Sequence, residues 1–81
     1  MVKILFFFNL VDLLGRNQEE LVLPAEIVNV DGLLALLGQR IEGFHSALSE
    51  GRGIQITINK KFAELSSPIQ DGDEVALFPK R

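Results

Sequence analysis

The fold of this chain is decided by one stretch, Val30–Arg40, which reads VDGLLALLGQR. Its apolar residues recur at near-helical spacing and form a wide stripe, which is typical of an amphipathic helix packed on one side. Asn29 or Asp31 is suited to cap the first turn. Gly32 and Gly38 each weaken a helix by about 1 kcal/mol relative to alanine. The stripe still predicts a helix over residues 30–40.

Two strands are expected before this helix. Val2 to Phe8 is rich in β-forming residues and almost wholly apolar, which is typical of a strand covered on both sides. Residues 19–23, EELVL, predict a second strand that Pro24 stops. Residues 9–15 predict a turn or a short helical stub that ends at Gly15. The two strands then form an antiparallel hairpin.

After the helix, residues 42–50 predict a short helical turn, and Gly51-Arg52-Gly53 predicts a loop. Residues 54–58, IQITI, alternate strictly between apolar and polar side chains. This pattern predicts a strand with one buried face. A bend follows at Asn59-Lys60-Lys61.

The last third of the chain predicts two more strands. Phe62 and Leu65 belong to a short one. Asp71-Gly72-Asp73 is a turn signal, and residues 74–78, EVALF, form a final strand that Pro79 ends. Asp71, Asp73 and Glu74 lack the number and spacing of ligands that a calcium loop needs, so we expect a turn and no metal site.

The order strand, strand, helix, strand, short strand, strand predicts an α+β fold. One helix covers only one face, so we expect a mixed sheet of four to five strands with one main helix packed on one face. A strand parallel to the first is reached only through a helical crossover. This is the β-grasp (ubiquitin-like) arrangement, and residues 1–81 are expected to form a single β-grasp domain. The alternative is a ferredoxin-like sandwich, which needs two full helices.

Composition excludes several classes of site. The chain has 81 residues, no Cys and one His, His45, so disulfides, thiolate nucleophiles and multi-His metal sites within one chain are ruled out. An independent enzyme would therefore have few catalytic groups. The net charge of −3 argues against nucleic-acid binding. The apolar start is too short for a transmembrane helix or a signal peptide. We expect no membrane association and a cytoplasmic location.

Several stretches of the chain resemble the small subunit of molybdopterin synthase and its ubiquitin-like sulfur-carrier relatives. The run Pro68–Pro79, PIQDGDEVALFP, carries the most specific match. The others are residues 2–7 (VKILFF), the Leu14-Gly15 turn, the helix over residues 30–37, and Ile58-Asn59 entering the Lys60-Lys61-Phe62 bend.

The resemblance implies a non-enzymatic carrier that delivers sulfur as a C-terminal thiocarboxylate for molybdenum cofactor biosynthesis. In that family the chain ends in Gly-Gly, since glycine suits a tail that threads into narrow active sites. A ubiquitin-activating-like adenylyltransferase adenylates the terminal carboxylate with ATP, and the large synthase subunit, which supplies the catalytic groups, takes the sulfur. The carrier itself binds no cofactor.

The end of this chain departs from the family pattern. It reads Pro79-Lys80-Arg81 in place of Gly-Gly. We therefore expect the chain as printed to be inactive in sulfur transfer, through truncation, cleavage or divergence. The alternatives are a thiamine-type sulfur carrier and a β-grasp interaction module without sulfur chemistry.

The resemblance also implies a partner interface. Phe7, Phe62 and Phe78 correspond to an apolar patch on the exposed sheet face, which docks the large subunit and the activating enzyme. Exposed aromatic residues often dominate such contacts. Lys60 and Lys61 would steer the partner. From the residues alone, the alternatives are that the phenylalanines are core residues and that the lysines form a solvated turn.

The side on which Phe7 lies depends on its neighbours. Phe6 and Phe8 have the opposite parity to Phe7 along the first strand. We therefore expect either Phe7 or the pair Phe6 and Phe8 to face the helix.

Overall fold

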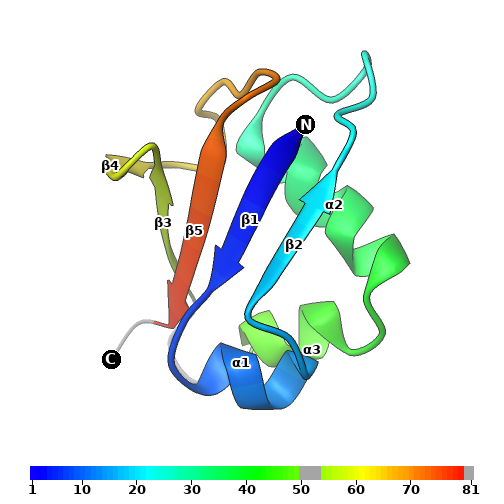
Figure 1. Cartoon of the computed structure of the whole chain (residues 1–81), viewed down its shortest axis with the longest axis vertical. Coiled ribbons are helices and arrows are strands. Elements are labelled where there is room, and N and C mark those ends of the chain that lie inside the picture. Colours follow the sequence, from blue (N-terminus) through cyan, green and yellow to red (C-terminus); the bar gives the residue numbers. More distant parts are fainter. Residues whose placement is uncertain (50–53, 80–81) are drawn as a thin grey trace.

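The structure, a computed structural model, describes residues 1–49 and 54–79. Gly51-Arg52-Gly53, for which a loop is predicted, lies outside the described residues. In Figure 1 the sheet is in front, α2 lies behind it, and α1 and α3 lie at its lower end. The elements are β1 (Val2–Phe6), α1 (Asn9–Leu14), β2 (Gln18–Leu21), α2 (Val30–Arg40), α3 (Phe44–Ser49), β3 (Ile54–Ile58), β4 (Lys61–Ala63) and β5 (Glu74–Pro79).

The five strands form one mixed sheet in the order β2-β1-β5-β3-β4. β5 is parallel to β1, while the β1–β2, β3–β5 and β3–β4 pairs are antiparallel. The last strand of the sequence therefore occupies the centre of the sheet, hydrogen-bonded on both sides. This arrangement confirms the predicted α+β fold of the β-grasp type.

The helix α2 follows the sequence pattern from end to end. It begins after Asn29, whose side chain accepts a hydrogen bond from the Gly32 N–H at 2.9 Å, and it ends at Arg40. Gly38 allows α3 to approach, because a Cβ on this residue would lie 1.9 Å from Nε2 of His45. The side chains that α2 buries against the sheet are those of Val30, Leu33, Leu34 and Leu37.

The core lies between the helices and one face of the sheet. The sheet supplies the buried side chains at alternating positions of its central strands: Val2, Ile4, Phe6, Val75 and Leu77. Phe44 of α3 is also buried, and its ring meets that of Phe6 edge to face with centroids 6.4 Å apart. Such edge-to-face pairs add about 0.5–1.5 kcal/mol beyond the burial of area.

Two expectations for the start of the chain are wrong. β1 is covered by the helices on one side only, since Lys3 and Leu5 point to the other face and are partly exposed. The strand ends at Phe6, which is buried, whereas Phe8 is exposed. Phe6 and Phe8 do not share a side because the backbone turns sharply at Phe8, where φ is 56°.

Three other strands differ from their predicted bounds, and β5 differs least, since it ends at Pro79 rather than at Phe78. β2 covers Gln18–Leu21 rather than residues 19–23, since it pairs only as far as β1 extends. β4 ends at Ala63, and Leu65 lies beyond it because its carbonyl accepts a hydrogen bond from the Asp31 N–H, at the start of α2.

The acidic stretch before β5 is a turn, as the sequence indicates. The Asp73 carboxylate accepts hydrogen bonds from the Gln70 N–H and from the Asn59 amide, both at 2.9 Å. Gly72 has a φ of 92°, which favours glycine. These contacts tie the β3–β4 turn to the start of β5.

Candidate protein interface on the open face of the sheet

The face of the sheet that no helix covers, called the open face below, carries a row of cross-strand neighbours. Leu5 of β1 pairs with Ala76 of β5, Ala76 pairs with Thr57 of β3, and Thr57 pairs with Phe62 of β4. Because cross-strand partners share a face, all four side chains point away from α2. The row is uncharged and contains mostly apolar side chains.

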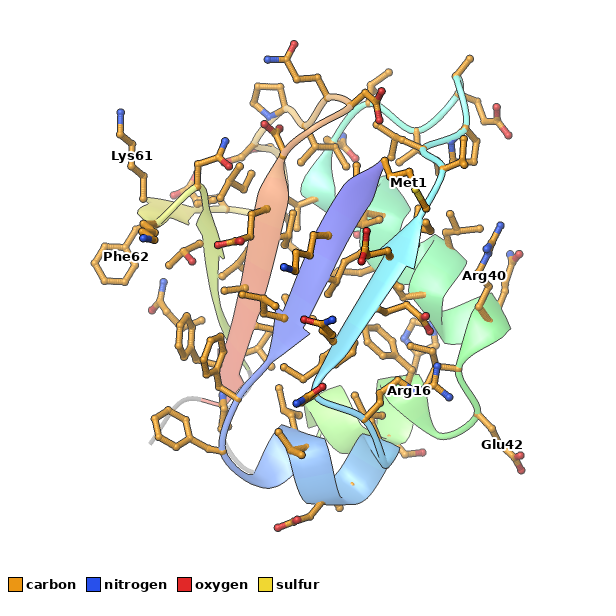
Figure 2. The ribbon with its side chains drawn as sticks, viewed as in Figure 1. Met1, Arg16, Arg40, Glu42, Lys61 and Phe62 are labelled. Carbon is orange, nitrogen blue, oxygen red and sulfur yellow. The ribbon has the colours of Figure 1, made fainter. Side chains whose placement is uncertain are left out.

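Phe62 lies at the outer edge of this row. Its side chain is 82% exposed, and Figure 2 shows it projecting from the short strand β4, away from the helices. An isolated exposed phenylalanine contributes little to a folded core. Phe62 is therefore available to another molecule.

Three phenylalanines meet where β1 and β5 end, and we call Phe7, Phe8 and Phe78 the aromatic cluster. The rings of Phe7 and Phe78 stack with centroids 4.5 Å apart and planes 13° apart. The Phe7 N–H donates to the Leu77 carbonyl at 3.2 Å, which extends the β1–β5 pairing by one residue. Phe8 adds a third ring, 6.5 Å from Phe7 and 6.3 Å from Phe78.

The structure thus brings two of the predicted interface residues together and sets the third apart. Phe7 and Phe78 are stacked, whereas Phe62 pairs with Thr57, two residues along β3 from Gln55, the partner of Phe78. All three lie on the open face and none is in the buried core. Their role in binding remains a prediction.

The predicted basic residues lie apart from the aromatic cluster. Lys60 is in the β3–β4 turn, with φ of 71°, and is exposed. Lys61 is also exposed, but its cross-strand partner is Ile58, which packs against the core. Lys61 therefore does not share the open face with Phe62. Pro79 ends β5 beside Ile54, and Lys80 and Arg81 lie outside the described residues.

The opposite end of the open face is charged. Lys3 of β1 lies between Glu20 of β2 and Glu74 of β5 in the strand register. The open face therefore changes along the strands, from a charged row beside the N-terminus to an aromatic cluster where β5 ends. The two ends of the open face therefore differ in charge.

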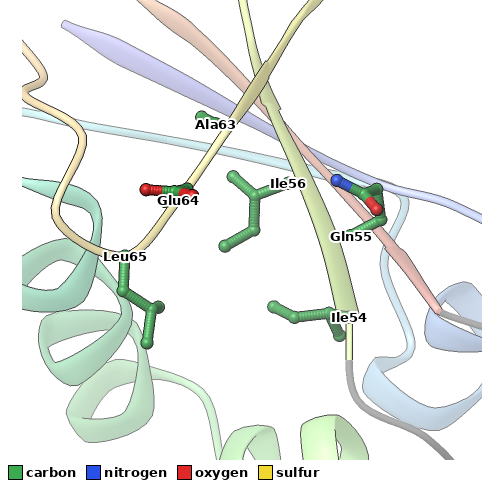
Figure 3. Close-up of a pocket in the computed structure, with 6 residues that line it drawn as sticks. All are labelled: Ile54, Gln55, Ile56, Ala63, Glu64 and Leu65. Carbon is green, nitrogen blue, oxygen red and sulfur yellow. The ribbon is translucent and has the colours of Figure 1, made fainter.

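A groove of about 410 Å³ opens where β4 diverges from β3 (Figure 3). Its lining is largely aliphatic, and Glu64 is its only ionisable residue; the lining residues are Ile54, Gln55, Ile56, Ala63, Glu64 and Leu65. Among the described lining residues, a single exposed carboxylate offers no acid–base pair.

Within residues 1–49 and 54–79, no group of three His, Cys, Asp or Glu residues is placed to hold a metal ion. No helix in the same part of the chain is long and apolar enough to cross a membrane. The ring of His45 lies beside Gly38 on the far side of the sheet from the open face. The feature that distinguishes the open face is its exposed aromatic side chains, Phe8 and Phe62 above all.

The sequence alone assigns no function to Phe8. Strand parity assigned it to the same side as Phe6, whereas its exposure and its neighbours place it in the aromatic cluster. One sequence feature could have indicated that Phe8 is exposed. It is the run of three phenylalanines directly before Asn9, where a turn is expected.

Comparisons with known proteins agree with this arrangement. The ThiS family model matches residues 4–80. The molybdopterin synthase sulfur carrier subunit of Escherichia coli (strain K12) is 30% identical over 79 residues, covering 98% of this chain and 94% of that protein. A putative molybdopterin converting factor subunit 1 from Pyrococcus furiosus superposes with a TM-score of 0.76 at 27% identity, covering 99% of this chain and 97% of that one.

A complex of subunits 1 and 2 of the molybdopterin-converting factor from Helicobacter pylori 26695 contains a chain of the same fold. The TM-score is 0.64 at 24% identity, with 99% of this chain and 93% of that chain covered. At that identity the likeness concerns the fold alone. It shows that a chain of this shape assembles with a second subunit in that organism.

Proposed function

Because this chain belongs to the ThiS family, we propose that it is the sulfur-carrying small subunit of a molybdopterin synthase and docks on the larger subunit through its open face. The chain is a homologue of the molybdopterin synthase sulfur carrier subunit. The observation that carries the docking proposal is the position of the stacked Phe7–Phe78 pair, at the end of the central strand β5. A partner that covers this pair also meets Pro79, where the described chain ends.

The proposed division of labour assigns the catalytic groups to the larger subunit. The chain has no Cys and a single His, and the side chains beside Pro79 on the open face are aromatic or amide groups. Such a surface can bind the larger subunit and orient the chain end on it. Among the residues that the structure describes there, none is suited to acid–base or nucleophilic catalysis.

Loading with sulfur would use a second partner, a ubiquitin-activating-like adenylyltransferase. This enzyme would join AMP from ATP to the C-terminal carboxylate and release pyrophosphate. Sulfide from a sulfur donor would then displace AMP and leave a thiocarboxylate. ATP belongs to the activating enzyme, and the carrier binds no cofactor of its own. We propose a cytoplasmic location, because these steps consume ATP.

The docking proposal is tested by complex formation with the molybdopterin synthase large subunit of the same cell. Phe62→Asp puts a charge at the edge of the open face and is expected to weaken the complex about tenfold or more. Val28→Asp is the matched control, since Val28 is 62% exposed but lies in the β2–α2 connection, hydrogen-bonded to Ile69. Unchanged affinity for Phe62→Asp and Phe78→Ala would contradict docking through this face.

The carrier role is tested by mass spectrometry of the protein purified from its own cell. A mature C-terminus in Gly-Gly, with part of the population heavier by the exchange of one oxygen for sulfur, would support the carrier role. A C-terminus at Arg81 that the adenylyltransferase does not adenylate would contradict sulfur transfer for this form. Binding to the large subunit without a thiocarboxylate would favour an interaction module over a carrier.

A further inference from the structure

The turn after β1 places a phenylalanine where glycine is usual. The Leu10 N–H donates to the Phe7 carbonyl at 3.2 Å and closes a four-residue turn with Phe8 at its second position. Phe8 has φ of 56° and ψ of −133°, close to the angles of a type II′ turn, whose second position favours glycine. A side chain with a Cβ is strained in this region of backbone space.

The fold itself gains little from this strained residue. The Phe8 side chain is 66% exposed and is not part of the buried core. Its ring instead extends the stacked pair of Phe7 and Phe78 outward. Strained backbone conformations persist mainly at functional sites, where the surrounding structure maintains them. An exposed aromatic ring at a strained backbone position therefore indicates a contact with another molecule.

The surroundings of Phe8 limit the kind of molecule that it contacts. Phe78 has the uncharged Gln55 as its cross-strand neighbour, and the charged row of the open face lies at the other end of the strands. An uncharged aromatic projection fits an apolar pocket in a protein, as is usual at the centre of an interface. The aromatic cluster also borders Pro79. We therefore expect the apolar pocket to belong to the same partner that receives the end of β5.

We propose that Phe8 is a specificity-determining contact with the larger synthase subunit, in which its ring enters an apolar pocket beside the site that receives the chain after Pro79. The II′-like turn holds the ring in place before the partner arrives, which lowers the ordering cost of binding. This inference rests on the proposed function, because the partner is the same subunit.

Two substitutions separate the ring from the backbone strain. Phe8→Ala removes the ring but keeps a Cβ, whereas Phe8→Gly removes both. We expect Phe8→Gly to melt roughly 4–8 °C above Phe8→Ala. Both are expected to weaken the complex with the molybdopterin synthase large subunit of the same cell about tenfold or more.

Two further variants sharpen the experiment. Phe8→Leu keeps an apolar side chain and is expected to recover part of the affinity. Leu13→Ala is the control, because Leu13 is 44% exposed on α1 but is not part of the aromatic cluster, and it should bind like the unaltered chain.

The outcomes distinguish this inference from the proposed function. If Phe8→Ala binds as tightly as the unaltered chain while Phe62→Asp does not, the role of Phe8 is overturned and docking through the open face stands. If the unaltered chain forms no complex, the proposed function fails and the role of Phe8 fails with it. A Phe8→Gly variant that melts below Phe8→Ala overturns the strain argument.

Discussion

The two faces of the sheet are built from alternate residues of the same strands, yet they differ in how their apolar side chains are used. On β5, Leu77 faces the helices and is fully buried, while the next residue, Phe78, faces outward and is half-buried. On β1, Ile4 is buried and Leu5 is not. The covered face stabilises the fold, whereas the open face leaves apolar surface exposed, as the proposed docking requires. The predictions below test this division.

The largest expected effect is on the covered face. Leu77→Ala should lower the free energy of unfolding by about 2–5 kcal/mol, because it removes buried methyl groups and leaves a cavity at the centre of the sheet. Phe78→Ala should cost clearly less, although it removes a larger side chain. Urea denaturation of the two variants measures the difference. Equal losses would mean that the open face belongs to the core.

A smaller effect is expected within the aromatic cluster. Phe7→Ala, Phe78→Ala and the double variant form a cycle, and the coupling between the stacked rings should be about 0.5–1.5 kcal/mol in the free protein. Phe62→Ala combined with Phe78→Ala is the control pair, since these residues are not cross-strand neighbours. A coupling near zero for Phe7 and Phe78 would show that the stacking contributes nothing before a partner binds.

The charged end of the open face should give a salt-dependent effect. Lys3→Glu places three carboxylates in adjacent strands, with Glu20 and Glu74, and should destabilise the protein by about 0.5–1 kcal/mol. The loss should shrink at high salt, where exposed charges are screened. Lys3→Gln removes the positive charge without adding a negative one and should cost less. A loss that salt leaves unchanged would point to altered packing.

The smallest effect concerns a contact that lies on neither face. The N-terminal ammonium of Met1 donates a hydrogen bond to Asp71, and this bond, together with the positive charge, holds the pKa of the Asp71 carboxyl below its ordinary value. A carboxyl with a lowered pKa stabilises the fold above its unfolded-state pKa, and this contribution is lost as the pH falls through the folded-state pKa. The window therefore lies below about pH 4.

NMR titration of the Asp71 carboxyl measures this shift directly. Asp71→Asn should flatten the pH dependence of stability below about pH 4. The slope of stability against pH near neutral pH should not change. A carboxyl that titrates at its ordinary value would show that the contact with Met1 does not persist in solution.

Much of the fold follows from short-range patterns in the sequence. The helix over residues 30–40 and the strand over residues 54–58 were predicted with the boundaries that the structure has, because each has a clear hydrophobic period. Local chemistry also predicts Asp71-Gly72-Asp73 as a turn and limits the helix cap to Asn29 or Asp31, of which Asn29 is the cap in the structure. These signals depend on residues close together in the chain.

The remaining features depend on contacts that are distant in the sequence. The position of β5 between β1 and β3 fixes the stacking of Phe7 on Phe78, and residues 7 and 78 carry no local sign of this proximity. The exposure of Phe8 could not follow from strand parity, since parity ends where the backbone turns. Whether a phenylalanine on the open face binds a partner is a property of two molecules.

The central position of β5 also determines how the protein responds to mechanical load. Tension applied at its carboxyl end acts along the strand, where hydrogen bonds to β1 and β3 resist it on both sides. Those bonds must break together in shear and cannot be unzipped one after another from an edge. The strand can therefore bear tension at its carboxyl end while the domain stays folded.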